Sequence, residues 1–174
     1  MASLRKGKCY RNLVRPFTRK SKVKSKSYIK TIPSSRVVRY EMGDSKKKFK
    51  YEINLVSKEK AQIRHNALES ARQVTNRRLQ LKLGNTGYYL QIKAYPHHIL
   101  RENKMLSGAH ADRLQTGMSH SFGKPVGLAS QIKKGKIIFT LKLDDTGLDV
   151  GKEAMKLAIP RIPVKCFVEV KKVE

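Results

Sequence analysis

A group of histidines with one nearby carboxylate is the first feature of this sequence that could do chemistry. His110 and Asp112 are spaced so that one could act as a general base and the other could orient it. No nucleophile motif accompanies them, and the adjacent His97 and His98 would point to opposite faces of a strand, so they could not share one metal. We therefore expect no catalytic site and no metal site, and we interpret the histidines as surface or RNA-contacting residues. An enzyme that acts on RNA through His110 and Asp112 is the alternative.

A glycine-rich segment, residues 117–125, superficially resembles a phosphate-binding loop. Five residues separate Gly117 from Gly123, where that motif needs four, and Pro125 stands where it needs a serine or threonine for magnesium. The segment also does not lead into a predicted helix. We therefore expect no nucleotide cofactor and no small-molecule substrate.

The two cysteines also offer little chemistry. Cys9 and Cys166 lie near opposite ends of the chain, and neither has a second cysteine or a histidine at zinc-binding spacing. Free thiols suit a reducing compartment. We expect no cofactor of any kind.

The charge of the chain indicates its partner more clearly than any catalytic motif does. The 174 residues contain 39 Lys and Arg against 13 Asp and Glu, a net charge of +26. Compaction of so many like charges opposes folding, and a polyanion relieves that repulsion. No apolar run approaches the roughly 20 residues that span a bilayer, so we expect no membrane partner. An organellar transit peptide would fit the Arg-rich, acid-poor beginning, but Pro16 and Pro33 interrupt an amphipathic helix, and we expect a cytoplasmic protein.

The first 40 residues hold 13 of the basic residues and no acidic residue. Within them Lys20, Lys22, Lys24 and Lys26 alternate with other residues, which in an extended segment would place their side chains in one row along a phosphate backbone. Tyr10, Phe17 and Tyr28 lie among these charges and could stack on unpaired bases. A solvated, disordered tail remains the alternative. We expect residues 1–35 to be a basic arm that binds RNA.

Residues 36–174 are predicted to form a single globular domain of the α+β class. Strands are expected at residues 36–40, 50–56, 88–94, 136–143 and 164–170. A helix capped by Ser57 should bury a stripe with Ile63, Ala67, Ala71 and Val74, and should end at Gly84. A second helix should cover residues 149–159, with Val150, Ala154, Leu157 and Ala158 inward. This pattern favours an antiparallel sheet with two helices on one face.

The first helix should carry a polar side that faces water or RNA, formed by Arg64, Glu69, Arg72, Asn76 and Arg77. Phosphate contacts fix position without reading sequence, so the basic arm and this helix side are the expected RNA-binding surface. The predicted RNA-binding residues are Arg5, Lys6, Lys8, Arg11, Arg15, Arg19, Lys20, Lys22, Lys24, Lys26, Arg64, Arg72, Arg77 and Lys124.

Hydrophobic periodicity fails between residues 101 and 123, a stretch far longer than an ordinary connection of about 4–6 residues. A long irregular segment inside a compact domain is usually functional or disordered, and we interpret this one as a functional loop. It contains the series Arg101-Glu-Asn-Lys-Met-Leu-Ser-Gly-Ala-His-Ala-Asp-Arg-Leu-Gln-Thr-Gly-Met118, followed by Phe122-Gly-Lys-Pro125 and Gly127-Leu-Ala129.

This loop resembles the central signature of the ribosomal protein family L-ten-e, the archaeal and eukaryotic branch of the universal family that includes bacterial L-sixteen. Cys9–Arg11, Pro96–His97 and Gly135–Phe139 are also similar. The chain ends soon after the last predicted strand, without the extension of eukaryotic members, which favours an archaeal source. Gly108 and His110 stand where eukaryotic relatives are expected to have Cys and Gly.

The resemblance implies an α/β-hammerhead-like fold and a structural, non-catalytic place on large-subunit rRNA, near 5S rRNA and beside other ribosomal proteins. It further implies that the loop helps shape the aminoacyl-tRNA corridor near the peptidyl-transferase centre and faces tRNA acceptor arms. The loop residues implied to face tRNA are Met105, Leu106, Ser107, Gly108, Ala109, His110, Ala111, Asp112 and Arg113. An RNA-binding chaperone outside the ribosome is the alternative function.

Overall fold

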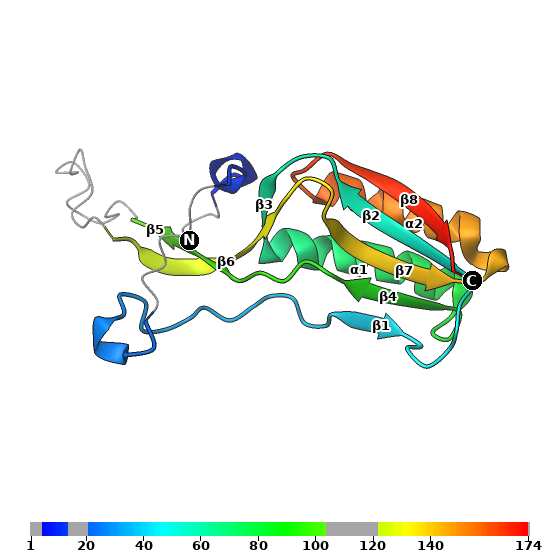
Figure 1. The fold of residues 1–174 in the computed structure, drawn as a ribbon, viewed down its shortest axis with the longest axis horizontal. Coiled ribbons are helices and arrows are strands. Elements are labelled where there is room, and N and C mark those ends of the chain that lie inside the picture. Colours follow the sequence, from blue (N-terminus) through cyan, green and yellow to red (C-terminus); the bar gives the residue numbers. More distant parts are fainter. Residues whose placement is uncertain (1–4, 14–20, 104–121, 174) are drawn as a thin grey trace, which may run out of the picture.

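The computed structural model describes residues 5–13, 21–103 and 122–173. In these ranges the chain forms two antiparallel sheets (Figure 1). The larger sheet has the order β1 (Glu41–Gly43), β4 (Tyr88–Ile92), β7 (Ile137–Leu143), β2 (Tyr51–Ser57) and β8 (Cys166–Lys172). The smaller sheet has the order β3 (Ala61–Arg64), β6 (Lys124–Ile132) and β5 (His98–Glu102).

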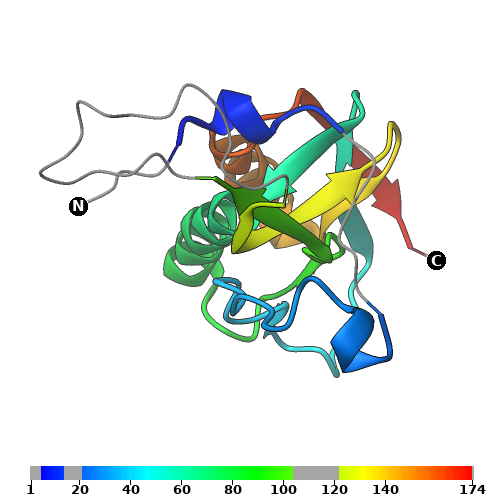
Figure 2. The same cartoon turned by 90° about the vertical axis from the view of Figure 1, so that its left-hand side faces the viewer.

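Two helices, α1 (His65–Leu83) and α2 (Leu148–Ala158), pack against one another and cover one face of the larger sheet (Figure 2). Ile53, Leu55 and Leu141 are fully buried in the core between the sheet and these helices. The predicted α+β class, with an antiparallel sheet and two helices, is confirmed. None of the described helices is long and apolar enough to cross a membrane.

The predicted beginning of the first helix is wrong. Ser57 is the last residue of β2, and its hydroxyl donates a hydrogen bond to the carbonyl of Glu59 at 2.6 Å. The chain then forms β3, so Ile63 pairs with Ser130 of β6 and belongs to a strand. The predicted end at Gly84 is confirmed: its φ is +69° and its N–H donates to Gln80 at 3.1 Å.

The predicted strand at residues 36–40 is also wrong, because helix side chains accept the hydrogen bonds that a neighbouring strand would have accepted. The N–H of Arg36 donates to His65 Nδ1 at 3.3 Å, and the N–H of Val38 donates to Glu69 Oε2 at 3.4 Å. Val37 is buried between these contacts. The segment therefore runs along α1, and β1 begins only at Glu41.

The smaller sheet was not predicted. β5 has only five residues, and Pro125 and Gly127 in β6 argue locally against a strand. These two strands pair directly, Glu102 with Lys124 at their ends, so the irregular stretch joins the two strands of a hairpin. Its residues 104–121 lie outside the described part of the chain. Figure 1 shows the smaller sheet extending away from the helix-covered body.

Close packing of α2 depends on Gly151. A Cβ atom at this position would lie 2.4 Å from Leu143 Cδ2 and 2.9 Å from Ile53 Cδ1. Ala154 and Ala158 are buried as predicted, whereas Leu157 is 39% exposed and Val150 is only half-buried. The inward side of α2 is thus narrower and made of smaller residues than the sequence pattern indicated.

Replacing Gly151 with Val should overpack this contact and lower the free energy of unfolding by about 1–3 kcal/mol. Urea unfolding followed by circular dichroism measures the change. Leu157→Ala on the exposed side of the same helix is the control and should change the free energy little. Equal losses in the two variants would contradict the packing described here.

Candidate RNA-binding surface

The beginning of the arm is attached to the smaller sheet. Residues 7–10 form a short 3-10 helix beside β3. The backbone N–H of Gln62 donates to the carbonyl of Arg11 at 2.9 Å, and its side-chain amide donates to the carbonyl of Tyr10 at 3.1 Å. Arg64 Nη1 donates to the carbonyl of Arg5 at 3.0 Å. β3 thus pairs with β6 on one side and holds the arm on the other.

Two predicted RNA-binding arginines take part in this attachment. Arg11 forms an ion pair with Glu59 at 3.0 Å, and the guanidinium of Arg64 lies 5.4 Å from the centre of the Tyr10 ring. Both side chains therefore stabilise the arm through protein contacts. Arg5, Lys6 and Lys8 remain exposed and are free of any ion pair within the described residues.

A second attachment lies further along the arm, where Ile29 is 5% exposed and packs with Ile99, Leu128 and Phe122. We call these four residues the arm anchor. The ring centroids of Tyr28 and Phe122 are 5.2 Å apart, and the Arg101 guanidinium lies 4.0 Å from the centroid of Phe122. The anchor therefore joins the arm to both strands that flank residues 104–121. Sequence reasoning missed it, although Arg101 and Phe122 mark the two ends of the irregular stretch.

Between the two attachments the predicted extended row of lysines is not observed. Lys24–Lys26 form a short 3-10 helix, which breaks the alternation of an extended strand. Lys22, Lys24 and Lys26 are nevertheless exposed. Arg15, Arg19 and Lys20, like the predicted tRNA-facing loop residues 105–113, lie outside the described residues.

Replacing Ile29 with Ala should loosen the arm without unfolding the body, because an enclosed Ile→Ala change costs about 2–5 kcal/mol of local packing. Trypsin should then cleave after Lys24 and Lys26 about tenfold faster or more, with fragments identified by mass spectrometry. Ile32→Ala, at an exposed position of the same segment, is the control and should leave the rate unchanged. Identical cleavage rates for both variants and the unchanged chain would mean that Ile29 does not anchor the arm.

The predicted polar side of α1 divides into two parts. Arg77 is exposed, as is Lys124 at the start of β6. Glu69 is instead 8% exposed, and the expectation that it faces water is wrong. Its carboxylate accepts hydrogen bonds from Arg72 Nε at 2.8 Å, from Gln73 Nε2 at 3.0 Å and from the backbone N–H of Val38 at 3.4 Å. Arg72 is therefore bound within the protein, with its side chain 12% exposed.

Burial by itself would raise the pKa of Glu69, but the hydrogen bonds from Arg72 and Gln73 and the charge of Arg72 hold it below its ordinary value. For a carboxyl group whose pKa falls on folding, the stabilisation is present above the ordinary pKa and is lost as the pH falls through the lowered one.

Glu69→Gln should accordingly destabilise the protein by about 3 kcal/mol at neutral pH, because it leaves the Arg72 charge enclosed without a partner. The difference from the unchanged protein should shrink as the pH falls below the ordinary pKa of glutamate and through the lowered pKa of Glu69, because that carboxyl group is then protonated in the unchanged protein as well. Urea unfolding at several pH values measures this. Glu153→Gln, which removes a half-exposed partner of Arg78, is the control and should have little effect at any pH. A pH-independent difference for Glu69→Gln would refute the ionic pair.

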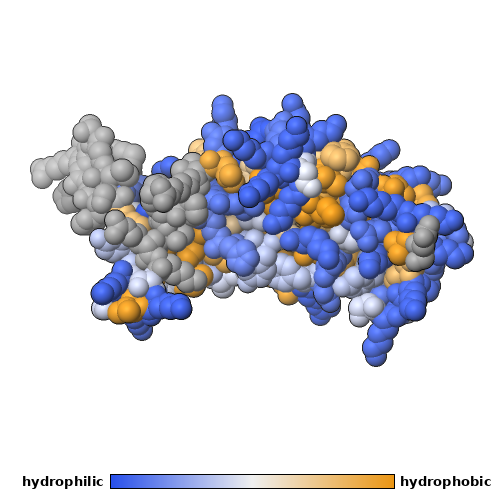
Figure 3. Space-filling view, in the orientation of Figure 1, coloured by the Kyte–Doolittle hydropathy of each residue, from blue (hydrophilic) through white to orange (hydrophobic). Residues whose placement is uncertain are grey.

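The charges are distributed unevenly along the molecule. Asp144, Asp145 and Asp149 follow the end of β7 and begin α2, far from the smaller sheet in Figure 1. Lys47 and Lys50 form ion pairs with Asp144 and Asp145 at 2.8 and 3.3 Å. Figure 3 shows hydrophilic side chains over much of one face, with apolar patches between them.

The opposite end carries exposed basic side chains with few carboxylates. We call it the arm end and define it by Arg5, Lys6, Lys8, Lys22, Lys24, Lys26 and Lys124. An end with mostly one sign of charge attracts polyanions and orients their approach.

Comparison with known proteins decides the family. The family model described as ribosomal protein L16p/L10e matches residues 15–169. The chain belongs to the L16p/L10e family of ribosomal proteins. It is similar to the large ribosomal subunit protein uL16 of Methanococcus aeolicus, with 46% identity over 98% of this chain and 95% of the relative. The uL16 proteins of Metallosphaera sedula (43% identity, 92% and 90% covered) and Saccharolobus islandicus (42%, 96% and 92%) are also similar.

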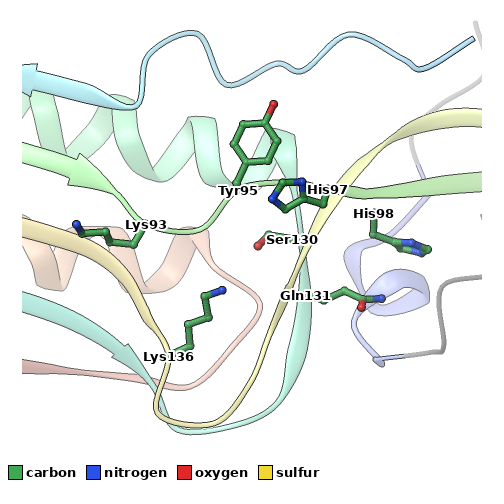
Figure 4. Close-up of a pocket in the computed structure, with 7 residues that line it drawn as sticks. All are labelled: Lys93, Tyr95, His97, His98, Ser130, Gln131 and Lys136. Carbon is green, nitrogen blue, oxygen red and sulfur yellow. The ribbon is translucent and has the colours of Figure 1, made fainter. Parts of the chain in front are cut away.

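These relatives come from archaea, in agreement with the archaeal affinity that the sequence indicated. Members of the L16p/L10e family are structural proteins of the ribosome, and this chain is not an enzyme. Of the histidines that the sequence offered as a chemical group, His97 and His98 lie in the described residues: the His97 ring lies 4.4 Å from the Tyr95 ring, whereas the His98 side chain extends away from both (Figure 4). Burial, aided by the charge of Arg101, lowers the pKa of His98.

The other chemical candidates of the sequence are metal ligands, the two cysteines and the glycine-rich segment. No group of three or more potential metal ligands occurs within residues 5–13, 21–103 and 122–173. Burial raises the pKa of the Cys166 thiol to about 11, and Cys9 is exposed; neither cysteine forms a disulfide. Lys124 and Pro125 of the glycine-rich segment enter a strand rather than a helix. In this L16p/L10e protein the arm end is therefore the main candidate site.

Proposed function

We propose that this chain is a structural constituent of the large ribosomal subunit that binds rRNA through its arm end. The observation that carries the proposal is the attached arm. The backbone and side-chain hydrogen bonds of Gln62 and the buried Ile29 hold a segment without acidic residues against the smaller sheet, with its lysines outward. A polyphosphate chain supplies the counter-charge that this arrangement lacks. Family membership supports the same assignment, and the protein would act in the cytoplasm.

The finer part of the proposal concerns residues 101–123. The hairpin of β5 and β6 provides a paired base for this loop, and the arm anchor links that base to the arm. We place residues 105–113 toward tRNA acceptor arms, in the aminoacyl-tRNA corridor near the peptidyl-transferase centre. The neighbours would include 5S rRNA and other ribosomal proteins. Peptide-bond chemistry would belong to the RNA, with this chain in a positioning role.

An RNA-binding chaperone outside the ribosome is the second candidate, because the basic arm would serve either function. Co-sedimentation with large subunits after a high-salt wash separates the two. A constituent of the subunit should stay in the large-subunit fraction at near one copy per particle. A chaperone should be washed off while still binding free RNA.

Binding to protein-free large-subunit rRNA should depend steeply on salt through the arm end. Replacing Arg5, Lys6 and Lys8 together with Ala should weaken binding and reduce the slope of log affinity against log salt by about 2–3, since each phosphate contact contributes about 0.7–0.9. Filter binding at several potassium chloride concentrations measures both quantities.

The matched control replaces Lys46, Lys47 and Lys48 with Ala, which removes the same charge from the opposite end of the molecule. This variant should keep most of the salt slope. If both triple variants lose the same slope, binding follows net charge alone and the arm end has no special part in it.

A further inference from the structure

A cavity of about 430 Å³ lies where the two sheets meet, outside the arm end (Figure 4). Lys93, Tyr95, His97, Ser130 and Lys136 are among the residues that line it. Its volume falls within the range of about 300–1,000 Å³ that is usual for small-ligand sites. No carboxylate is found among its described lining residues. The cavity therefore combines aromatic rings with positive charge.

Three rings pack together on the aromatic side of the cavity. Tyr40 and Tyr95 are stacked, with centroids 5.2 Å apart and planes inclined by 23°, and the His97 ring lies 4.4 Å from Tyr95 at a tilt of 45°. The N–H of His97 donates to the carbonyl of Tyr95 at 3.1 Å across Pro96, a tight turn that the fixed φ of proline favours. Tyr95 is nevertheless 49% exposed, so part of this fixed side chain remains accessible to a ligand.

The basic side of the cavity comes from two lysines on well-fixed backbone. Lys93 extends β4, and its N–H donates to Ile138 of β7 at 2.9 Å. Lys136 lies in the turn before β7, where its carbonyl accepts a hydrogen bond from Ser57 at 3.0 Å. Both lysines are exposed, and neither takes part in an ion pair with a described residue. Figure 4 shows the Lys136 side chain directed into the cavity, whereas the Lys93 side chain points away from Tyr95 and His97.

We propose that this cavity binds one unstacked nucleotide of RNA, with its base against Tyr95 and His97 and its phosphate held by Lys136. The inference rests on the proposed RNA-binding function and adds a specific contact to it. Aromatic rings accept any base through stacking, and an ammonium group beside them binds phosphate. Two lysines make the cavity unsuitable for a cationic ligand. A bulged or looped-out base, rather than a paired one, has the exposed ring face that the cavity requires.

Titration of the full-length 15N-labelled chain with AMP tests the site directly by NMR. Amide shifts should concentrate at residues 93–95, 97, 130 and 136. Adenosine and ribose 5-phosphate, which lack the phosphate and the base respectively, should each bind about tenfold more weakly or worse. Shifts spread over all the lysines, or equal affinity for ribose 5-phosphate and AMP, would overturn the proposal.

Variants separate stacking from charge. Tyr95→Ala should lower the affinity for AMP about tenfold, the size expected for losing one base–aromatic stack, and Tyr95→Phe should restore it because the ring is retained. Lys136→Ala should weaken AMP binding severalfold, whereas Lys134→Ala, an exposed lysine of the same turn that does not line the cavity, should not. Failure of Tyr95→Phe to restore binding would overturn the stacking role.

Competition distinguishes an RNA nucleotide from a free mononucleotide. A hairpin RNA with a single bulged adenine should displace AMP from the chain at much lower concentration than a fully paired hairpin of the same length. Equal displacement by the two hairpins would overturn the RNA assignment. Failure of the broader function would look different: the unchanged chain would then not bind large-subunit rRNA at all. If only the cavity proposal fails, rRNA binding and its salt slope remain and the AMP contact is absent.

Discussion

Holding a cationic arm against a cationic body is the constraint on which this structure depends. Coulomb repulsion within a chain of net charge +26 opposes the attachment, so specific contacts must overcome it. They are the hydrogen bonds from Gln62 to residues 10–11, the ion pair of Arg11 with Glu59, and the enclosure of Ile29 by the arm anchor. None of these contacts uses the exposed lysines. The arm is thereby held in a defined place while its charges stay available to a partner.

The few carboxylates strengthen this arrangement by their positions. Glu59 and Glu69 bind groups of the protein itself: Glu59 pairs with Arg11, and the buried Glu69 accepts hydrogen bonds from Arg72 and from the N–H of Val38. Asp144 and Asp145 neutralise lysines at the far end of the larger sheet. The uneven charge gives the molecule an orientation relative to a polyanion, and the arm anchor relates that orientation to the hairpin that carries residues 104–121. A scaffold of this kind can position a loop without any catalytic chemistry of its own.

Much of the fold could be predicted from sequence because periodicity reports burial on one face of a long element. β7 and α2 were predicted in this way, and the end of α1 was predicted from its terminal glycine, Gly84. The errors arose where tertiary contacts decide: residues 36–40 bond to helix side chains, and β3 and β5 are too short to show a pattern. At the site, composition identified the basic arm, but not that Arg11, Arg64 and Arg72 have protein partners. The ribosomal assignment came from the family signature in residues 101–118. The charge of the chain alone predicts only that it binds RNA.

Lysine reactivity mapped by mass spectrometry, before and after the chain joins large subunits, tests the central claim most directly. Brief acetylation labels the lysines of the free chain and of the purified particle. If the arm end faces the rRNA, the particle should strongly protect Lys6, Lys8, Lys24 and Lys26 from acetylation. Lys46 and Lys48, at the opposite end of the molecule, should remain reactive. Protection of Lys46 and Lys48 with the arm lysines left reactive would contradict the account.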